Sequence, residues 1–121
     1  MQDDVLYHGT TRDYHRRALK NGSYRPLNLA ESVRLSNDVS SAYGEAVSRG
    51  DGFEGLSILV IRRDMIPGLR NGAGFCCDSL PQESYILVDL EVENYILTNN
   101  TKHRLEAAKE EVLKRSYAFS L

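Results

Sequence analysis

A strand that ends in an imidazole, a glycine and a hydroxyl is the first feature of this sequence that could do chemistry. The apolar run Val5-Leu6-Tyr7 predicts a β-strand, and His8-Gly9-Thr10 follows it directly. Gly9 lets the backbone turn or approach a ligand closely, and His8 offers two ring nitrogens for hydrogen bonding. This grouping is typical of a binding site, and it also fits an edge strand whose histidine is structural.

The segments that must position this tetrad predict a mixture of helices and strands. Residues 64–78 contain three glycines and a proline, so they are expected to form a loop. A loop of this length in a small domain is either mobile or functional. Without internal repeats or a low-complexity linker, residues 1–121 are expected to form one α+β domain. The predicted helices are 11–21, 39–48 and 101–116, and the predicted strands after the first are 32–36, 56–62, 84–92 and 93–98.

Composition narrows the possible classes of function. The 121 residues are 41% hydrophobic and carry a net charge of −2, which argues against a general binder of nucleic acids or membrane surfaces. No apolar run is long enough to span a bilayer, and the acidic residues 1–4 do not resemble a signal peptide. Cys76 and Cys77 are adjacent, so they predict neither a disulfide nor a metal site. We expect a soluble cytoplasmic protein without a bound metal.

Four segments follow one another in an order that resembles the histidine-containing branch of the ADP-ribosyltransferase family, which includes poly(ADP-ribose) polymerases and diphtheria-type toxins. The strand end Tyr7-His8-Gly9-Thr10 is the first, and Leu35-Ser36 at the end of a later strand is the second. Ala42-Tyr43-Gly44 on the next helix is the third. Glu83, just before the apolar strand Tyr85-Ile86-Leu87-Val88, is the fourth. The resemblance covers residues 5–98.

The resemblance implies a fold and an activity. The fold would be two small packed antiparallel sheets with flanking helices and a C-terminal helix. The activity would be the transfer of ADP-ribose from NAD, as co-substrate, to an unidentified acceptor, with release of nicotinamide. The acceptor could be a protein, a nucleic acid or a small molecule, and a chain of this size would be a stand-alone modifying enzyme or toxin-like effector.

Each matching residue has a physical role in such a site. Glu83 would be catalytic, because a carboxylate stabilises the positive charge that develops on the ribose as the nicotinamide bond breaks. The backbone of Gly9 would bind the nicotinamide amide, while His8 and Thr10 would hold ribose or adenosine hydroxyls. Tyr43 would lie against the cationic ring. The predicted NAD-binding residues are His8, Gly9, Thr10, Arg34, Ser36 and Tyr43.

Two departures from the family pattern leave alternatives open. Arg34 stands where this branch usually has a tyrosine, and it could pair with Glu83 or hold a pyrophosphate. Ser84 separates Glu83 from the strand, so Gln82 or Asp78 could serve instead.

A second hypothesis is therefore a catalytically inactive domain of the same fold that binds a partner or a nucleotide-like ligand. A third is a relative of the RNA 2′-phosphotransferases, which share the His-Gly-Thr strand end. The enzyme hypothesis makes a geometric prediction, namely that His8, Tyr43 and Glu83 line one cleft.

Overall fold

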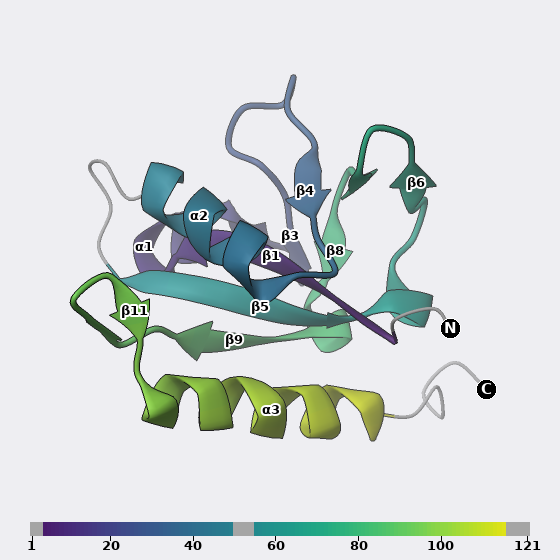
Figure 1. Ribbon diagram of the computed structural model, residues 1–121. Coiled ribbons are helices and arrows are strands. Elements are labelled where there is room, and N and C mark those ends of the chain that lie inside the picture. Colours follow the sequence, from purple (N-terminus) through teal and green to yellow (C-terminus); the bar gives the residue numbers. More distant parts are fainter. Residues whose placement is uncertain (1–3, 50–54, 116–121) are drawn as a thin grey trace.

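The computed structural model describes residues 4–49 and 55–115 (Figure 1). Its helices are α1 (Arg12–Ala18), α2 (Val39–Arg49) and α3 (Asn99–Leu113), and two 3₁₀ turns cover Arg63–Met65 and Gln82–Ser84. Its strands are β1 (Val5–Thr11), β2 (Leu19–Lys20), β3 (Ser23–Tyr24), β4 (Val33–Leu35), β5 (Leu56–Arg62), β6 (Arg70–Asn71), β7 (Phe75–Cys77), β8 (Leu80–Pro81), β9 (Tyr85–Asp89), β10 (Val92–Glu93) and β11 (Ile96–Leu97).

The central sheet has the order β1-β5-β9, and both of its strand pairs are antiparallel. Its middle strand is the predicted strand 56–62, and its residues from Ile58 to Ile61 are all 0% exposed. An apolar run without alternation is the pattern expected of a strand that is covered on both sides.

Two apolar clusters lie on opposite sides of this sheet, because successive side chains of a strand point in opposite directions. Leu6 belongs to the cluster that contains Tyr24 of β3 and Tyr14 of α1. Tyr7 belongs to the cluster formed with α2 and α3. Figure 1 shows α3 lying along one side of the sheet, beside β9. The side chains on the two faces of β1 therefore pack in different apolar clusters.

The remaining strands form small antiparallel sheets with the orders β2-β3-β8, β4-β7-β6 and β10-β11. The α+β class, the small antiparallel sheets and the C-terminal helix are confirmed. Together with the central sheet, the described residues contain four antiparallel sheets, where two were expected. Helix α1 ends at Ala18, earlier than predicted, because Leu19 and Lys20 pair with β3.

The caps of the helices follow the preferences of their residue types. Thr11 accepts a hydrogen bond from the Tyr14 N–H at the start of α1, and Asp38 accepts from the N–H groups of Ser40 and Ser41 at the start of α2. The cap of α3 is Thr98, whose hydroxyl accepts from the Thr101 N–H. Helix α3 begins two residues earlier than predicted, so Thr101 lies in its first turn.

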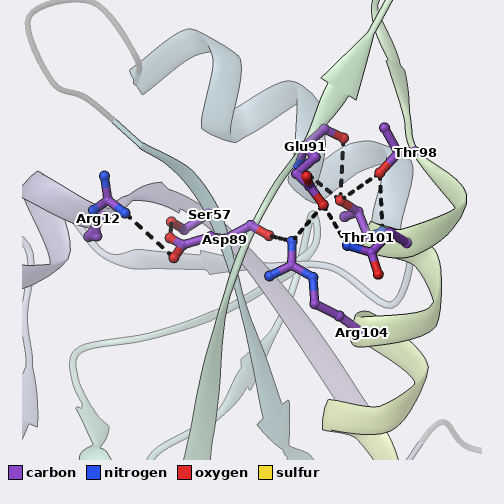
Figure 2. A network of polar contacts seen from close by, with 8 residues as sticks. Arg12, Ser57, Asp89, Glu91, Thr98, Thr101 and Arg104 are labelled. Carbon is purple, nitrogen blue, oxygen red and sulfur yellow. Dashed lines mark hydrogen bonds and ion pairs between the residues drawn. The ribbon is translucent and has the colours of Figure 1, made fainter.

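A polar network anchors α3 to the end of the central sheet (Figure 2). Arg104 donates to the Asp89 carbonyl at 2.5 Å and lies 3.6 Å from the Glu91 carboxylate. The Thr101 hydroxyl accepts from the Glu91 N–H at 2.8 Å. Because Arg104 holds an outward-facing carbonyl of the edge strand β9, that end of the strand is unavailable for pairing with another strand. None of the described residues belongs to a helix long and apolar enough to cross a membrane.

Helix α2 packs closely against β1 at Gly9. A Cβ atom added at Gly9 would lie 1.8 Å from the Ala42 carbonyl oxygen and 2.6 Å from the Ala46 nitrogen. Gly9 was expected to open the backbone to a ligand, and what approaches it is the backbone of this helix. The residue type is therefore needed for folding.

Two alanine substitutions should shift stability in opposite directions. Gly9→Ala must push α2 away from the sheet, and we expect a loss of about 3 kcal/mol in the free energy of unfolding. Gly44→Ala, on the same helix, meets no atom within 4 Å and should add about 0.5–1 kcal/mol, because alanine favours a helix over glycine. Urea unfolding measures both. Equal stabilities for the two variants would contradict the close approach at Gly9.

Candidate functional site

The residues predicted to form the NAD site are distributed over different parts of the fold. His8 and Thr10 are 1% and 0% exposed, and both bond the Tyr24 hydroxyl in the core. Tyr43 packs against the cluster that contains Tyr7, on the opposite side of the sheet. Glu83 is exposed in a 3₁₀ turn. The structure does not bring His8, Tyr43 and Glu83 to one cleft.

The strand order accounts for the separation of His8 and Glu83. His8 pairs with Leu59, whereas β9 begins opposite Ile61 and Glu83 precedes it. Strand β5 lies between β1 and β9, so two strand spacings alone separate the two residues by about 10 Å. The Glu83 carbonyl accepts a hydrogen bond from Arg115.

The alternatives to Glu83 and the remaining predicted residue lie elsewhere. Gln82 is exposed in the same turn as Glu83. Asp78 is paired with Arg70 at 3.0 Å. Ser36 exchanges backbone hydrogen bonds with Tyr7, and its hydroxyl accepts from the Asp38 N–H, so it supports the start of α2.

His8 is the centre of a buried hydrogen-bond network. Its Nδ1 lies 2.7 Å from the Arg34 carbonyl oxygen and 3.0 Å from Glu45 Oε1. Both of these atoms are acceptors, so Nδ1 carries the proton. In the neutral imidazole, Nε2 then accepts from the Tyr24 hydroxyl at 2.9 Å. Burial raises the pKa of Tyr24 well above its ordinary value, which keeps that hydroxyl protonated.

A second histidine–tyrosine pair packs against the first. His15 Nε2 lies 2.7 Å from the Tyr85 hydroxyl, and its ring stacks on Tyr24 with centroids 5.6 Å apart. Burial, with a smaller contribution from His8, lowers the pKa of His15. Burial also raises the pKa of Tyr85 to about 12. The protonated Tyr85 hydroxyl therefore donates to a neutral His15.

Glu45 connects the buried network to the surface. Its Oε1 accepts from the Gly9 N–H at 3.1 Å and from His8 Nδ1, and its side chain is 18% exposed. Sequence reasoning missed this residue. The available signal was its position on the buried stripe of α2, next to Ala46 and three residues after Ala42, where a carboxylate requires a partner.

A polar cleft of about 780 Å³ opens beside Glu45. One wall is α2, and the other is formed by β4, β7 and residues 30–32 before β4. Arg34 is paired across the strands with Cys76, so the two side chains share one face of that sheet. The residues that give the cleft its polar character are Glu31, Ser32, Arg34, Ser41, Glu45, Ser48 and Arg49.

Two arginines of this cleft have no carboxylate partner among the described residues. Arg34 projects from the middle of β4 and is exposed. Arg49 lies with its guanidinium carbon 5.3 Å from the centre of the Tyr14 ring, and its Nε is buried without a hydrogen-bond partner in the described part of the chain. By contrast, the nearby Arg70 is neutralised by Asp78. The cleft thus presents two guanidinium groups, together with the carboxylates of Glu31 and Glu45, to any ligand that enters it.

This set of groups suits a ligand that carries both phosphate and hydroxyl groups. Guanidinium groups bind phosphate oxygens through paired hydrogen bonds. A carboxylate beside them accepts from a hydroxyl. Within residues 4–49 and 55–115, no three His, Cys, Asp or Glu side chains come together in a way that could hold a metal ion.

Comparisons with protein-family models, with curated proteins and with solved structures return no match. The likeness to the ADP-ribosyltransferase family therefore depends on the four motifs alone.

The free energy of unfolding should fall in mild acid, because His15 of this network must then bind a proton. The folded-state pKa of His15 lies below its ordinary 6.5, so the unfolded chain binds a proton more readily. The stabilisation that the neutral His15 gives the folded protein is complete above pH 6.5. It is lost as the pH falls through the lower folded-state pKa of His15. Tm should drop between about pH 7.5 and pH 5, and drop less in His15→Gln, which does not titrate. Parallel Tm profiles for the two proteins would contradict this assignment.

Proposed function

We propose that this chain is a nucleotide-binding domain, organised like an ADP-ribosyltransferase, that holds its ligand in the cleft between α2 and the β4-β7-β6 sheet. One observation carries the proposal: Arg34, Arg49 and Glu45 line the same cleft, and neither arginine has a carboxylate partner among the described residues. A cytoplasmic location, where Cys76 and Cys77 stay reduced, belongs to the same proposal.

The two walls of the cleft supply different parts of the recognition. Arg34 comes from a strand and Arg49 from the last turn of α2, so a diphosphate between them can be held from two sides. Glu45 Oε2 makes no hydrogen bond to the described protein, while Oε1 is already held by His8 and Gly9. This second oxygen is available to accept from a sugar hydroxyl.

Binding without turnover is favoured by the way this chain uses its own tetrad. The Gly9 N–H and His8 Nδ1, which were expected to bind NAD, both contact Glu45. Glu83 is not among the residues that line the cleft. These placements support the hypothesis of a catalytically inactive domain.

Calorimetric titration with NAD, ADP-ribose and ADP tests the proposal. Arg34→Ala and Arg49→Ala should each weaken binding roughly tenfold or more, because each removes charge-assisted hydrogen bonds. Arg25→Ala is the matched control, since Arg25 is exposed and does not line the cleft. Absence of binding by all three nucleotides, or an equal loss in Arg25→Ala, would contradict the proposal.

Thiol labelling gives a second measure of occupancy. Cys76 lines the cleft and is partly exposed, whereas Cys77 is 0% exposed and burial raises its pKa to about 12. A thiol reagent should therefore label Cys76 first, and a bound nucleotide should slow that reaction. Cys76→Ser should remove the fast phase. A labelling rate that no nucleotide alters would contradict binding in this cleft.

ADP-ribose transfer from NAD to an acceptor is the second candidate function. The observation that favours it is a carboxylate inside the cleft, Glu45, which is oriented by the buried His8. Such a group could stabilise the charge that develops on the ribose as the bond to nicotinamide breaks.

Measurement of nicotinamide release from NAD separates these two candidates. A transferase that uses this cleft should release nicotinamide, lose the activity in Glu45→Gln and keep it in Glu83→Gln. Loss of activity in Glu83→Gln alone would restore Glu83 as the catalytic residue. NAD binding without release would support the binding domain.

A further inference from the structure

The tip of the β10–β11 hairpin holds a large side chain in a conformation that favours glycine. Glu93 pairs with Ile96, so the loop consists of Asn94 and Tyr95 alone, with φ values of 51° and 65°. Two-residue hairpin loops of this kind prefer Asn-Gly, because the second position is unfavourable for a residue with a Cβ. Tyr95 is nevertheless there, and it is 91% exposed.

The described part of the chain buries little of this tip. Tyr95 projects into solvent, and its neighbour Ile96 is 63% exposed. Strained residues are retained where another requirement outweighs the strain, and adjacent exposed apolar side chains mark contact surfaces. The hairpin tip thus has the properties of a residue pair that packs against another molecule.

An apolar hollow of about 510 Å³ lies directly beside this tip. Its walls come from α2, the hairpin and α3, and Figure 1 shows the hairpin next to the start of α3. The hairpin tip itself forms part of the wall. The apolar residues that line the hollow are Val39, Tyr43, Tyr95, Ile96, Leu97 and Leu105. A projecting apolar tip and an apolar hollow therefore occupy one surface of the same chain.

The rim of this hollow carries one exposed charge of each sign on α3. Lys102 and Glu106 are both exposed, one helical turn apart on α3, and the described residues provide neither with an ion-pair partner. Lysine placed before glutamate at this spacing is the weaker orientation for pairing within one helix. In an isologous contact between two copies, a Glu106 that meets Lys102 of the other copy implies the reciprocal contact as well.

We propose that this surface is where two copies of the chain associate, with Tyr95 of each copy seated in the hollow of the other. The occupant is a second copy because this one surface carries the projecting tip, the hollow and both charges, which is what an isologous contact requires. The interface does not depend on the nucleotide cleft, which uses Ser41, Glu45 and Arg49 of α2 where this hollow uses Val39 and Tyr43.

Sedimentation analysis of the full chain over a range of concentrations tests the proposal. The wild type should show a monomer–dimer equilibrium, and Tyr95→Gly should raise the dimer Kd roughly tenfold or more. Its Tm at low concentration should be unchanged or higher, since glycine suits the turn. Ile96→Ser is the second variant on the surface. Leu29→Ser is the control, because Leu29 is 90% exposed and does not line the hollow.

Charge reversal tests the symmetry directly. Lys102→Glu and Glu106→Lys should each be monomeric alone, because each would bring like charges together across the axis. An equimolar mixture of the two variants should associate, since both contacts then join opposite charges. A wild type that is monomeric at every concentration, a mixture that fails to associate, or a Leu29→Ser variant as disruptive as Tyr95→Gly would each overturn the proposal. A folded monomer that captures an apolar ligand in the hollow would do the same.

Discussion

The approach of α2 to the edge of β1 is the contact on which the rest of this structure depends. Tyr7 and Gly9 direct their N–H groups away from β5, and at an exposed edge these donors would remain unpaired in the sheet. The chain satisfies them in two ways. Tyr7 exchanges hydrogen bonds with Ser36 at 2.7 and 2.9 Å, and the Gly9 N–H donates to Glu45. Only glycine at position 9 allows the helix backbone to come this close.

This packing draws a carboxylate to a buried imidazole. Glu45 lies on the helix side that faces β1, so the approach at Gly9 places its Oε1 at His8 as well. His8 in turn bonds Tyr24, which contacts the aromatic rings of Tyr14, His15 and Tyr85. The polar groups of this core are consequently linked from the wall of the cleft to the far side of the sheet, and removal of one member would leave others unsatisfied.

The same contact orients α2 so that its residues line two different surfaces. One side carries Ser41, Glu45 and Arg49 toward the polar cleft, and the other carries Val39 and Tyr43 toward the apolar hollow near the hairpin. Tyr43 was expected to face a cationic ring, and its actual neighbours are apolar. A short helix held at one close contact can thus separate two surfaces of opposite character within a small domain.

Local patterns in the sequence were sufficient for the α+β class, the strand Leu56–Arg62 and the C-terminal helix, because these depend on neighbouring residues. The motif of imidazole, glycine and hydroxyl was also visible, but its partners were not. Tertiary structure alone decided that Gly9 meets a helix backbone, that His8 turns into the core, and that β5 separates His8 from Glu83. Strand order and the direction of each side chain are long-range properties, and no local spacing specifies them.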